Sequence, residues 1–347
     1  MISNFAEHGC LLTKYLNMTK RNIFIALQLF TFFFFSLARA QQTNIQFTVS
    51  QDGTGDYKTI QEAVNAVRDH MQFKVSIFVK PGIYHEKLVV PAWKKNIRII
   101  GENPEKTIVT NGDYTGKAFP GGDFTGNPKF GTYTSYTVLV QGNDCSLENI
   151  TIENTAGPIG QAVALTVESD RFAAKNCILL GHQDTLYTSK DGRCYFENCL
   201  IAGTTDFIFG EATVIFSKCK IKSLTDSFIT AASTTKEQAF GYVFLDCDLI
   251  AAPGVKKVFL GRPWRPFAKT VFIRCNLGEQ IIPEGWHAWP GDPLFANKDK
   301  TAFYAEYSNT GAGANTTARV AWAKQLTRRE ANSYTVKNIF GNWTPTF

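Results

Sequence analysis

A short segment that recurs six times between residues 147 and 277 limits the folds open to this chain more than any other feature. In five copies a residue three positions before a cysteine and another two positions after it are apolar, and in the first copy Ile150 replaces the cysteine. The central positions are 150, 177, 199, 219, 247 and 275, so the steps are 27, 22, 20, 28 and 28 residues. One short strand in every ~20–30 residues is typical of a solenoid.

A repeat of this length cannot bury its apolar face alone. Turns stacked about 4.8 Å apart hydrogen-bond each backbone group to the next turn and close a continuous core. The spacing therefore predicts an all-β fold, a right-handed parallel β-helix, with residues 75–79 and 96–100 as earlier turns. A β-propeller is the alternative repeat fold, but it needs about four strands in 40–45 residues, and these repeats are too short.

The cysteines of the repeat are expected to line the interior of this solenoid. Equivalent positions on stacked turns have parallel Cα–Cβ vectors, so we expect most of the seven cysteines after residue 40 to be free thiols. A zinc site is the alternative, but the chain contains no Cys-x-x-Cys pair.

The two ends of the repeat region have different patterns. Residues 56–67 carry apolar side chains at helical spacing, which predicts a helix that caps the open end of the solenoid. Residues 112–131 are Gly-rich and polar and are expected to form a long loop. Residues 282–347, with four tryptophans, are expected to form irregular structure and a helix along the flank. No linker divides the chain, so we expect a single domain over residues 41–347.

The first forty residues have the parts of a secretory signal peptide. Two basic residues precede the apolar run 23–35, and an Ala-x-Ala sequence ends at Ala40. The run is shorter than the about 20 residues of a membrane-spanning helix. We therefore expect a signal peptide at 1–40, with Met18 as the alternative initiator, and a secreted or periplasmic protein. A lipid anchor is the other interpretation, but no cysteine lies at the cleavage point.

The charge balance excludes few partners. Without the first forty residues the chain has 32 basic and 29 acidic residues, a net charge of +3. No basic run stands out, so nucleic acid is not expected as a partner. A slight positive balance tolerates an acidic substrate without predicting one. We expect a monomer with no membrane association after signal cleavage.

Two pairs of polar residues share a spacing of 22, namely Gln161 with Gln183 and Asp184 with Asp206. Each aspartate lies seven residues after the cysteine of its repeat, so equal positions on neighbouring turns would bring their carboxyls within about 5 Å. Two carboxyls this close do not both ionise readily, which favours one acid and one base or nucleophile. Two solvated turn residues are the alternative, but Asp206 precedes the apolar segment 207–209, which would desolvate it.

Three further residues are expected near these carboxyls. The side-chain amides of Gln161 and Gln183 could stabilise an oxyanion, or could form a structural ladder that satisfies its own amides. Arg262 precedes the cysteine of its repeat by 13 residues, as Asp206 does, which predicts the same column two turns on. Its guanidinium would then hold Asp206 ionised. Trp264 could stack on a sugar ring or serve only as a packing aromatic.

Five motifs in this order resemble those of the pectin methylesterases, carbohydrate esterases built on a right-handed parallel β-helix. The resemblance extends from about residue 46 to residue 343. The motifs are GIYHE at 82–86, QAVAL at 161–165, GHQDTLY at 181–187, DFIFG at 206–210 and LGRPW at 260–264.

The resemblance implies a carboxylic ester hydrolase that removes C6 methyl esters from homogalacturonan (pectin), giving pectate and methanol. It implies that Asp206 is the nucleophile and Asp184 the general acid and base. Gln161 and Gln183 match the oxyanion donors, and Arg262 matches the residue that orients the nucleophile. No metal and no organic cofactor is implied.

Substrate contacts are also implied by the resemblance. Trp264 matches a residue that contacts the sugar, and Thr132 loosely matches a substrate-binding threonine. Tyr187 and Phe209 lie inside the quoted motifs and are expected to contact substrate. We expect the same of Gln161 and Arg262.

The sequence departs from the family pattern beside the catalytic positions. His182 stands where plant members commonly have Tyr, and Glu211 where they often have Asn, so the pH optimum and subsite preference are expected to differ. Asp226 falls one turn beyond Asp206 in the predicted register and has no assigned role. A signal peptide with no inhibitor-like segment before the catalytic region predicts a bacterial-type member without a pro-domain.

Two other functions remain open from the sequence. Another β-helix pectinase, either a lyase or a hydrolase, would cut glycosidic bonds, and a lyase would use Ca²⁺ and a basic residue. A non-catalytic β-helix would only bind the polysaccharide. Methanol release without chain cleavage, unaffected by EDTA, would distinguish an esterase from these alternatives.

Overall fold

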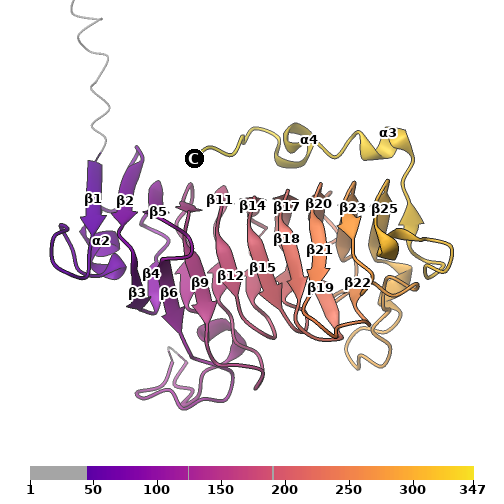
Figure 1. Cartoon of the computed structure of the whole chain (residues 1–347), viewed down its shortest axis with the longest axis horizontal. Helices are drawn as coiled ribbons and strands as arrows, with labels where there is room; N and C mark the ends of the chain where they lie inside the picture. Colours follow the sequence, from indigo (N-terminus) through magenta and orange to yellow (C-terminus); the bar gives the residue numbers. More distant parts are fainter. Residues whose placement is uncertain (1–44, 124, 190) are drawn as a thin grey trace, which may run out of the picture. The chain divides into compact units, whose positions relative to one another are not determined.

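The computed structural model describes residues 45–123, 125–189 and 191–347, so the predicted signal peptide at 1–40 lies outside the described residues. Within the described residues, no helix is both long enough and apolar enough to span a membrane. Their strands form three sheets in which every strand runs parallel to its neighbours. Successive turns of the coil are laid side by side in Figure 1. These three long parallel sheets confirm the predicted parallel β-helix.

Each sheet takes its strands from successive turns. Sheet A contains β1 (Ile45–Val49), β2 (Val75–Val79), β5 (Ile97–Gly101), β8 (Ser146–Glu148), β11 (Phe172–Lys175), β14 (Arg193–Glu197), β17 (Thr213–Ser217), β20 (Tyr242–Leu245), β23 (Lys269–Ile273), β25 (Phe303–Tyr307) and β26 (Lys324–Gln325). Sheet B contains β3 (Gly82–His85), β6 (Thr107–Asn111), β9 (Thr151–Asn154), β12 (Ile178–Leu180), β15 (Leu200–Gly203), β18 (Lys220–Ser223), β21 (Asp248–Ala251) and β24 (Asn276–Leu277). Sheet C contains β4 (Leu88–Val90), β7 (Val138–Val140), β10 (Leu165–Val167), β13 (Leu186–Thr188), β16 (Ile208–Gly210), β19 (Phe228–Ala232) and β22 (Phe259–Gly261).

A single residue with left-handed backbone separates sheet A from sheet B in each of six turns. This corner residue lies immediately before the repeated cysteine position, as Asn176 does between β11 and β12. A left-handed residue bends the chain sharply, and Asn tolerates that conformation better than most residues other than Gly. The φ angles at the six corners are 52° at Asn149, 52° at Asn176, 54° at Asn198, 55° at Lys218, 55° at Asp246 and 54° at Arg274.

Apolar and cysteine side chains of successive turns stack in columns inside the coil. Phe216, Phe244 and Phe272 are fully buried, with ring centroids 4.5 and 4.3 Å apart along the stack. All seven described cysteines are buried and free, which confirms the predicted interior ladder. The Cys219 thiol donates to the backbone carbonyl of Phe196 on the previous turn, over 3.5 Å. Each turn is therefore tied to the next by backbone, ring and thiol contacts.

Helix α2 (Ile60–Ala66) lies at the N-terminal end of the coil, as predicted for a capping helix. Thr59 and Glu62 form a capping box, because each side chain accepts a hydrogen bond from the backbone N–H of the other. Ile60, Ala63 and Val64 are completely buried against the first turns. The helix thus supplies the apolar cover that a terminal repeat needs.

The expectation for residues 282–347 is only partly correct. This segment contains the short helices η2 (Lys298–Lys300), η3 (Ala312–Ala314), α3 (Arg328–Ala331) and α4 (Val336–Phe340). However, β25 and β26 add two further strands to sheet A, and the sequence did not reveal them because no cysteine marks that turn. In Figure 1, α3 and α4 run back along sheet A. Ile339 and Phe340 of α4 pack against Ile215 and Val243 on the outer face of that sheet.

The predicted loop at 112–131 precedes the short helix η1 (Thr132–Thr134). Residues 112–123 and 125–131 contain no regular strand or helix, which confirms the loop. One isolated antiparallel bridge joins Ala118 to Lys129. Thr132 and Tyr133, which directly follow the loop, lie beside residues of sheet C.

Candidate active site

A cavity of about 260 Å³ lies on the face of sheet C that is turned away from the core. The side chains that line it come from sheet C, from the residues just before strands of that sheet, and from the C-terminal segment. The lining residues are Thr132, Tyr133, Gln161, Gln183, Asp184, Asp206, Phe209, Ala231, Arg262, Trp264 and Trp289. All of the predicted site residues except Tyr187 therefore meet in one cavity.

The two aspartates occupy equal positions on neighbouring turns. Leu186 pairs with Ile208 in the register of β13 and β16, so Asp184 and Asp206 each lie two residues before their strand. Both have left-handed backbone, with φ of 67° and 49°. At the end of β16, Gly210 has φ of 119°, and an added Cβ would lie 1.9 Å from the Thr188 carbonyl oxygen. Only glycine allows the two turns to approach so closely here.

The two carboxyls are similarly buried but have different charged neighbours. Asp184 and Asp206 are 8% and 6% exposed. Burial, followed by the charge of Asp206, raises the pKa of Asp184 to about 8. Burial also raises the pKa of Asp206, but hydrogen bonds from Arg262 and its charge oppose that rise. Arg262 therefore favours the charged form of Asp206, whereas burial and the neighbouring Asp206 favour the protonated form of Asp184.

Arg262 bridges both oxygens of Asp206. Its Nε lies 3.0 Å from one carboxylate oxygen, and its Nη2 lies 2.7 Å from the other. The guanidinium carbon also lies 4.0 Å from the Phe228 ring centre and 3.6 Å from that of Trp289. A bidentate pair of this kind fixes the orientation of the carboxylate as well as its charge.

The predicted column of Arg262 is wrong. Ile208 pairs with Thr230 and Thr230 with Gly261, so Arg262 shares the column of Phe209 and reaches sideways to Asp206. In the turn of Asp206, Val214 of sheet A lies six positions after Ile208 of sheet C. In the turn of Arg262, the equivalent residues are Gly261 and Thr270, which are nine positions apart. Counting back from the cysteine misplaced Arg262 because the connection from sheet C to sheet A is three residues longer in its turn than in the turn of Asp206.

Gln161 and Gln183 are paired by an isolated parallel bridge, which confirms their predicted stacking. Both line the cavity beside the carboxyls. Within the described residues, no side-chain hydrogen bond joins the two amides to each other. The arrangement therefore does not support the alternative of a self-satisfied glutamine ladder, and it leaves N–H groups available to a ligand.

Aromatic side chains form the floor and walls of the site. Tyr187 is buried and stacks on Phe209 with ring centroids 4.7 Å apart, and Phe209 meets the Trp264 ring edge-on at 5.9 Å. Two lining aromatics were missed from the sequence, Tyr133 and Trp289. Tyr133 directly follows the predicted Thr132, but Trp289 lies in the C-terminal segment, where no repeat defines a register.

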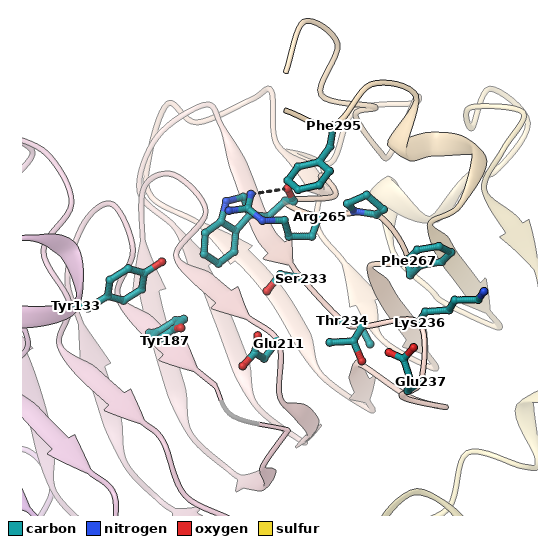
Figure 2. Close-up of a pocket in the computed structure, with 13 residues that line it drawn as sticks. Tyr133, Tyr187, Glu211, Ser233, Thr234, Lys236, Glu237, Arg265, Phe267 and Phe295 are labelled. Atoms are coloured by element: carbon teal, nitrogen blue, oxygen red, sulfur yellow. Dashed lines mark hydrogen bonds between the residues drawn. The ribbon is translucent and has the colours of Figure 1, made fainter. Parts of the chain in front are cut away.

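A second, larger cavity continues from the first. It has a volume of about 630 Å³ and shares Tyr133 and Trp264 with the smaller one. Figure 2 shows Tyr133 and Tyr187 at its left. The polar residues follow to the right, with Ser233, Glu211 and Thr234 in the middle and Lys236 and Glu237 beyond them. Arg265 donates to the Trp264 carbonyl oxygen over 3.1 Å. The two cavities together form a polar, aromatic-lined depression along sheet C.

Three residues have no assigned role, namely His182, Glu211 and Asp226. Only Glu211 lines one of the two cavities. Glu211 lines the larger cavity and accepts a hydrogen bond from the Ser189 hydroxyl at 3.2 Å. His182 lines neither cavity; burial lowers its pKa, and its Nδ1 has no hydrogen-bond partner among the described residues. Asp226 is exposed and accepts from the backbone N–H groups of Lys256 and Lys257, over 2.7 and 2.9 Å.

The register predicted for Asp226 is therefore also wrong, since Phe228 follows Asp206 in the column. Asp226 instead holds a neighbouring loop. As for metals, the described residues contain no group of three or more His, Cys, Asp or Glu side chains that could hold an ion.

Comparison with known proteins places this site in a family. The pectinesterase family profile matches residues 46–342. The probable pectinesterase/pectinesterase inhibitor 23 of Arabidopsis thaliana is 38% identical over 302 residues, which cover 83% of this chain and 50% of the relative.

Solved structures agree with this match. Carrot pectin methylesterase superposes with a TM-score of 0.78 and 34% identity, over 87% of this chain and 94% of that one. A pectin methylesterase in complex with a hexasaccharide superposes with a TM-score of 0.74 and 28% identity, over 89% and 99%.

The curated relatives differ from this chain in length, and they come from plants. The chain spans about half the length of the curated relatives it matches. These relatives are plant proteins, so they do not support the prediction of a bacterial-type member. Since the family profile spans nearly all of the described coil, the chain belongs to the pectinesterase family.

Proposed function

We propose that residues 41–347 form the catalytic domain of a pectinesterase that hydrolyses the C6 methyl esters of homogalacturonan, releasing methanol and leaving pectate. Family membership supports the reaction class. The observation that carries the proposal is the carboxyl pair: Asp206 held by two hydrogen bonds from Arg262, beside Asp184 with a pKa of about 8. One nucleophile and one proton donor are what an acyl transfer of this kind needs.

In the first step a carboxylate oxygen of Asp206 attacks the ester carbonyl carbon, and the electron pair of the carbonyl moves to its oxygen. The side-chain N–H groups of Gln161 and Gln183 donate to this oxyanion, which no longer needs solvent to stabilise it. The bond to the methoxy oxygen then breaks, and Asp184 gives that oxygen its proton. Methanol leaves, and an anhydride joins Asp206 to the galacturonate.

In the second step the roles of Asp184 reverse. The carboxylate of Asp184 now takes a proton from water, and the resulting hydroxide attacks the galacturonate carbonyl of the anhydride. The anhydride bond breaks, Asp206 recovers its negative charge, and Asp184 is again protonated. The galacturonate leaves as a free carboxyl group that ionises in water. The cycle uses side chains of this chain and one water molecule.

The depression along sheet C is proposed to bind several sugar units. Trp264 and Tyr133 lie between the two cavities and offer ring faces to sugars. Thr132 and Phe209 line the smaller cavity, and Tyr187 lines the larger. The complex of a related pectin methylesterase with a hexasaccharide supports a polymeric ligand. We further propose a secreted monomer that acts on pectin outside the cell.

Methanol release from methylated oligogalacturonides tests the proposal. The protein should release methanol, and Asp206→Asn should lower the rate by at least about 10⁴-fold, since a neutral amide cannot attack the ester. Asp226→Asn is the matched control, because Asp226 is an exposed aspartate outside both cavities. Full activity of the Asp206 variant would disprove the assignment of the nucleophile.

The same incubation distinguishes the competing functions. A pectin lyase or glycosidic hydrolase would lower the viscosity of the polymer, and EDTA would inhibit a Ca²⁺-dependent lyase. A protein that only binds polysaccharide would leave the polymer unchanged after prolonged incubation. An esterase releases methanol at constant chain length, with or without EDTA.

A further inference from the structure

We infer that Lys298 is a positioning residue for the reaction proposed above: held by Asp292, its ammonium group fixes the Trp289 ring against Arg262, the guanidinium that holds Asp206. The inference rests on the proposed function, because its consequence is the state of the Asp206 nucleophile. It concerns the segment 287–300, which lies between β24 of sheet B and β25 of sheet A.

Lys298 is an unusual lysine because its side chain is completely buried. The residue is 1% exposed, and its ammonium lies 2.5 Å from an Asp292 carboxylate oxygen and 3.4 Å from the Trp264 carbonyl oxygen. A buried ammonium is costly unless it is paired. Lys300 of the same 3₁₀ helix is exposed, so the helix itself does not require a buried lysine.

The lysine reaches the catalytic residues through one aromatic ring. Its ammonium nitrogen lies 4.5 Å from the centre of the Trp289 ring, and the Arg262 guanidinium carbon lies 3.6 Å from it. Two cations repel each other, but the negative face of an indole attracts both. The ring therefore allows Lys298 and Arg262 to lie close together, while each keeps its own carboxylate partner, Asp292 or Asp206.

Both ends of the segment are anchored so that the ring keeps this place. Trp289 has left-handed backbone, with φ of 55°, and its N–H donates to Nδ1 of His287 over 3.0 Å. Asp292 also accepts from the backbone N–H groups of Leu294 and Phe295, over 2.9 and 3.3 Å. Asp292 thus fixes the turn at residues 292–295 with one carboxylate oxygen and holds Lys298 with the other.

The charges around the nucleophile give this arrangement a measurable effect. Asp184, Arg262 and Lys298 face Asp206; burial raises its pKa, whereas Arg262 and then Lys298 lower it. Asp292, Arg265 and Arg262 face Lys298, whose pKa is lowered chiefly by burial and raised by Asp292. Removing the ammonium should therefore raise the pKa of Asp206, both directly and by loosening Arg262.

Lys298→Met removes the charge and keeps an unbranched apolar side chain. We expect kcat for methanol release to fall about tenfold or more, as misplacement of a catalytic group does. The acid limb of the kcat/KM profile should move to higher pH, because Asp206 must be ionised to attack. Lys300→Met is the matched control and should leave both quantities unchanged. Asp292→Asn, which leaves the lysine without its carboxylate, should act in the same direction as Lys298→Met.

A second measurement does not depend on activity. Incorporated 5-fluorotryptophan gives Trp289 a ¹⁹F resonance that Trp289→Phe identifies by its disappearance. This resonance should shift in Lys298→Met and Asp292→Asn, and should stay in place in Lys300→Met. If the unmodified protein released no methanol, the proposed function would fail, whereas the ¹⁹F result would still decide the position of the ring.

The outcomes separate positioning from simple stabilisation. A lysine that only stabilises the fold would lower the melting temperature in Lys298→Met and leave the acid limb and the ¹⁹F resonance unmoved, which would overturn the inference. If Lys298→Met does not fold, Asp292→Asn decides the question by the same two measurements. An unmoved acid limb in the folded Asp292 variant would likewise overturn it.

Discussion

Asp184 and Asp206 are similarly buried carboxyls that differ in their contacts with one neighbouring guanidinium. Burial raises the pKa of both, but only Asp206 receives two hydrogen bonds from Arg262. The chain places both aspartates at the same point of consecutive turns, so the difference arises from the turn that carries Arg262. The spacing in the sequence predicts the aspartate pair. It does not predict how Arg262 reaches Asp206, because that depends on the length of the connection between two strands of one turn.

The raised pKa of Asp184 predicts an alkaline limit to activity. In the proposed mechanism Asp184 can protonate the leaving methoxy oxygen only in its protonated form, which predominates below its pKa of about 8. As pH rises through that value, Asp184 loses its proton, and kcat/KM should fall. Asp184→Asn cannot transfer a proton, so it should lower kcat by about 10²–10⁴-fold and abolish the alkaline limb. A pH profile of methanol release tests this, and an alkaline limb retained in the variant would assign it to another group.

The paired glutamines predict a loss in kcat rather than in binding. Gln183→Ala removes one proposed oxyanion donor and should lower kcat by about 10²–10³-fold with little change in KM. Gln72→Ala is a suitable control, because Gln72 is exposed and lies far from the cavity in the chain. Steady-state methanol release gives both constants. A higher KM at unchanged kcat would mean that Gln183 binds the substrate without stabilising the oxyanion.

At the scale of single elements, the repeat predicts which residues occupy equal positions on successive turns. It does not predict features that occur in one turn only, such as a longer connection between strands. The cysteine and aromatic columns, the glutamine pair and the aspartate pair follow from shared spacing. The column of Arg262 does not, because the connection from sheet C to sheet A is three residues longer in its turn. Trp289 and Tyr133 lie on segments outside the repeat, so no spacing connected them to the cavity.

The stacked phenylalanines predict that a single core position affects the stability of several turns. Phe244 is fully buried between Phe216 and Phe272, at centroid distances of 4.5 and 4.3 Å. Phe244→Ala should lower the free energy of unfolding by about 3–5 kcal/mol, because it leaves a cavity between two rings. Phe78→Ala on β2, where the side chain is 38% exposed, should cost much less. Urea unfolding of both variants makes the comparison, and equal losses would argue against a tightly packed column.

At the scale of the whole coil, the two ends are closed by different means. Helix α2 covers the N-terminal turn with three buried apolar residues. At the other end, loops cover the last turn around a buried ion pair between Glu306 of β25 and Arg319, whose side chains are 1% and 4% exposed. The helix was predictable from its periodicity. The ion pair was not, because two residues that lie 13 positions apart in irregular sequence have no pattern to connect them.

Arg319 is predicted to determine the stability of the C-terminal end. It donates to both carboxylate oxygens of Glu306, over 2.8 and 3.2 Å, and to the backbone carbonyls of Ile282, Pro283 and Gly313. Arg319→Met would leave the Glu306 charge buried without its partner. This should lower the free energy of unfolding by about 3–5 kcal/mol. Thermal unfolding should then occur about 5–10 °C lower.

The double variant Arg319→Met/Glu306→Gln separates the cost of a stranded charge from the loss of the loop contacts. It removes the charge together with its partner, so it should be more stable than Arg319→Met alone. The exposed Arg329, in α3, provides the control Arg329→Met, which should leave the melting temperature unchanged. If the double variant were no more stable than the single one, the backbone carbonyls that Arg319 binds would carry the effect. The closure of the last turn would then depend on the loops and not on the ion pair.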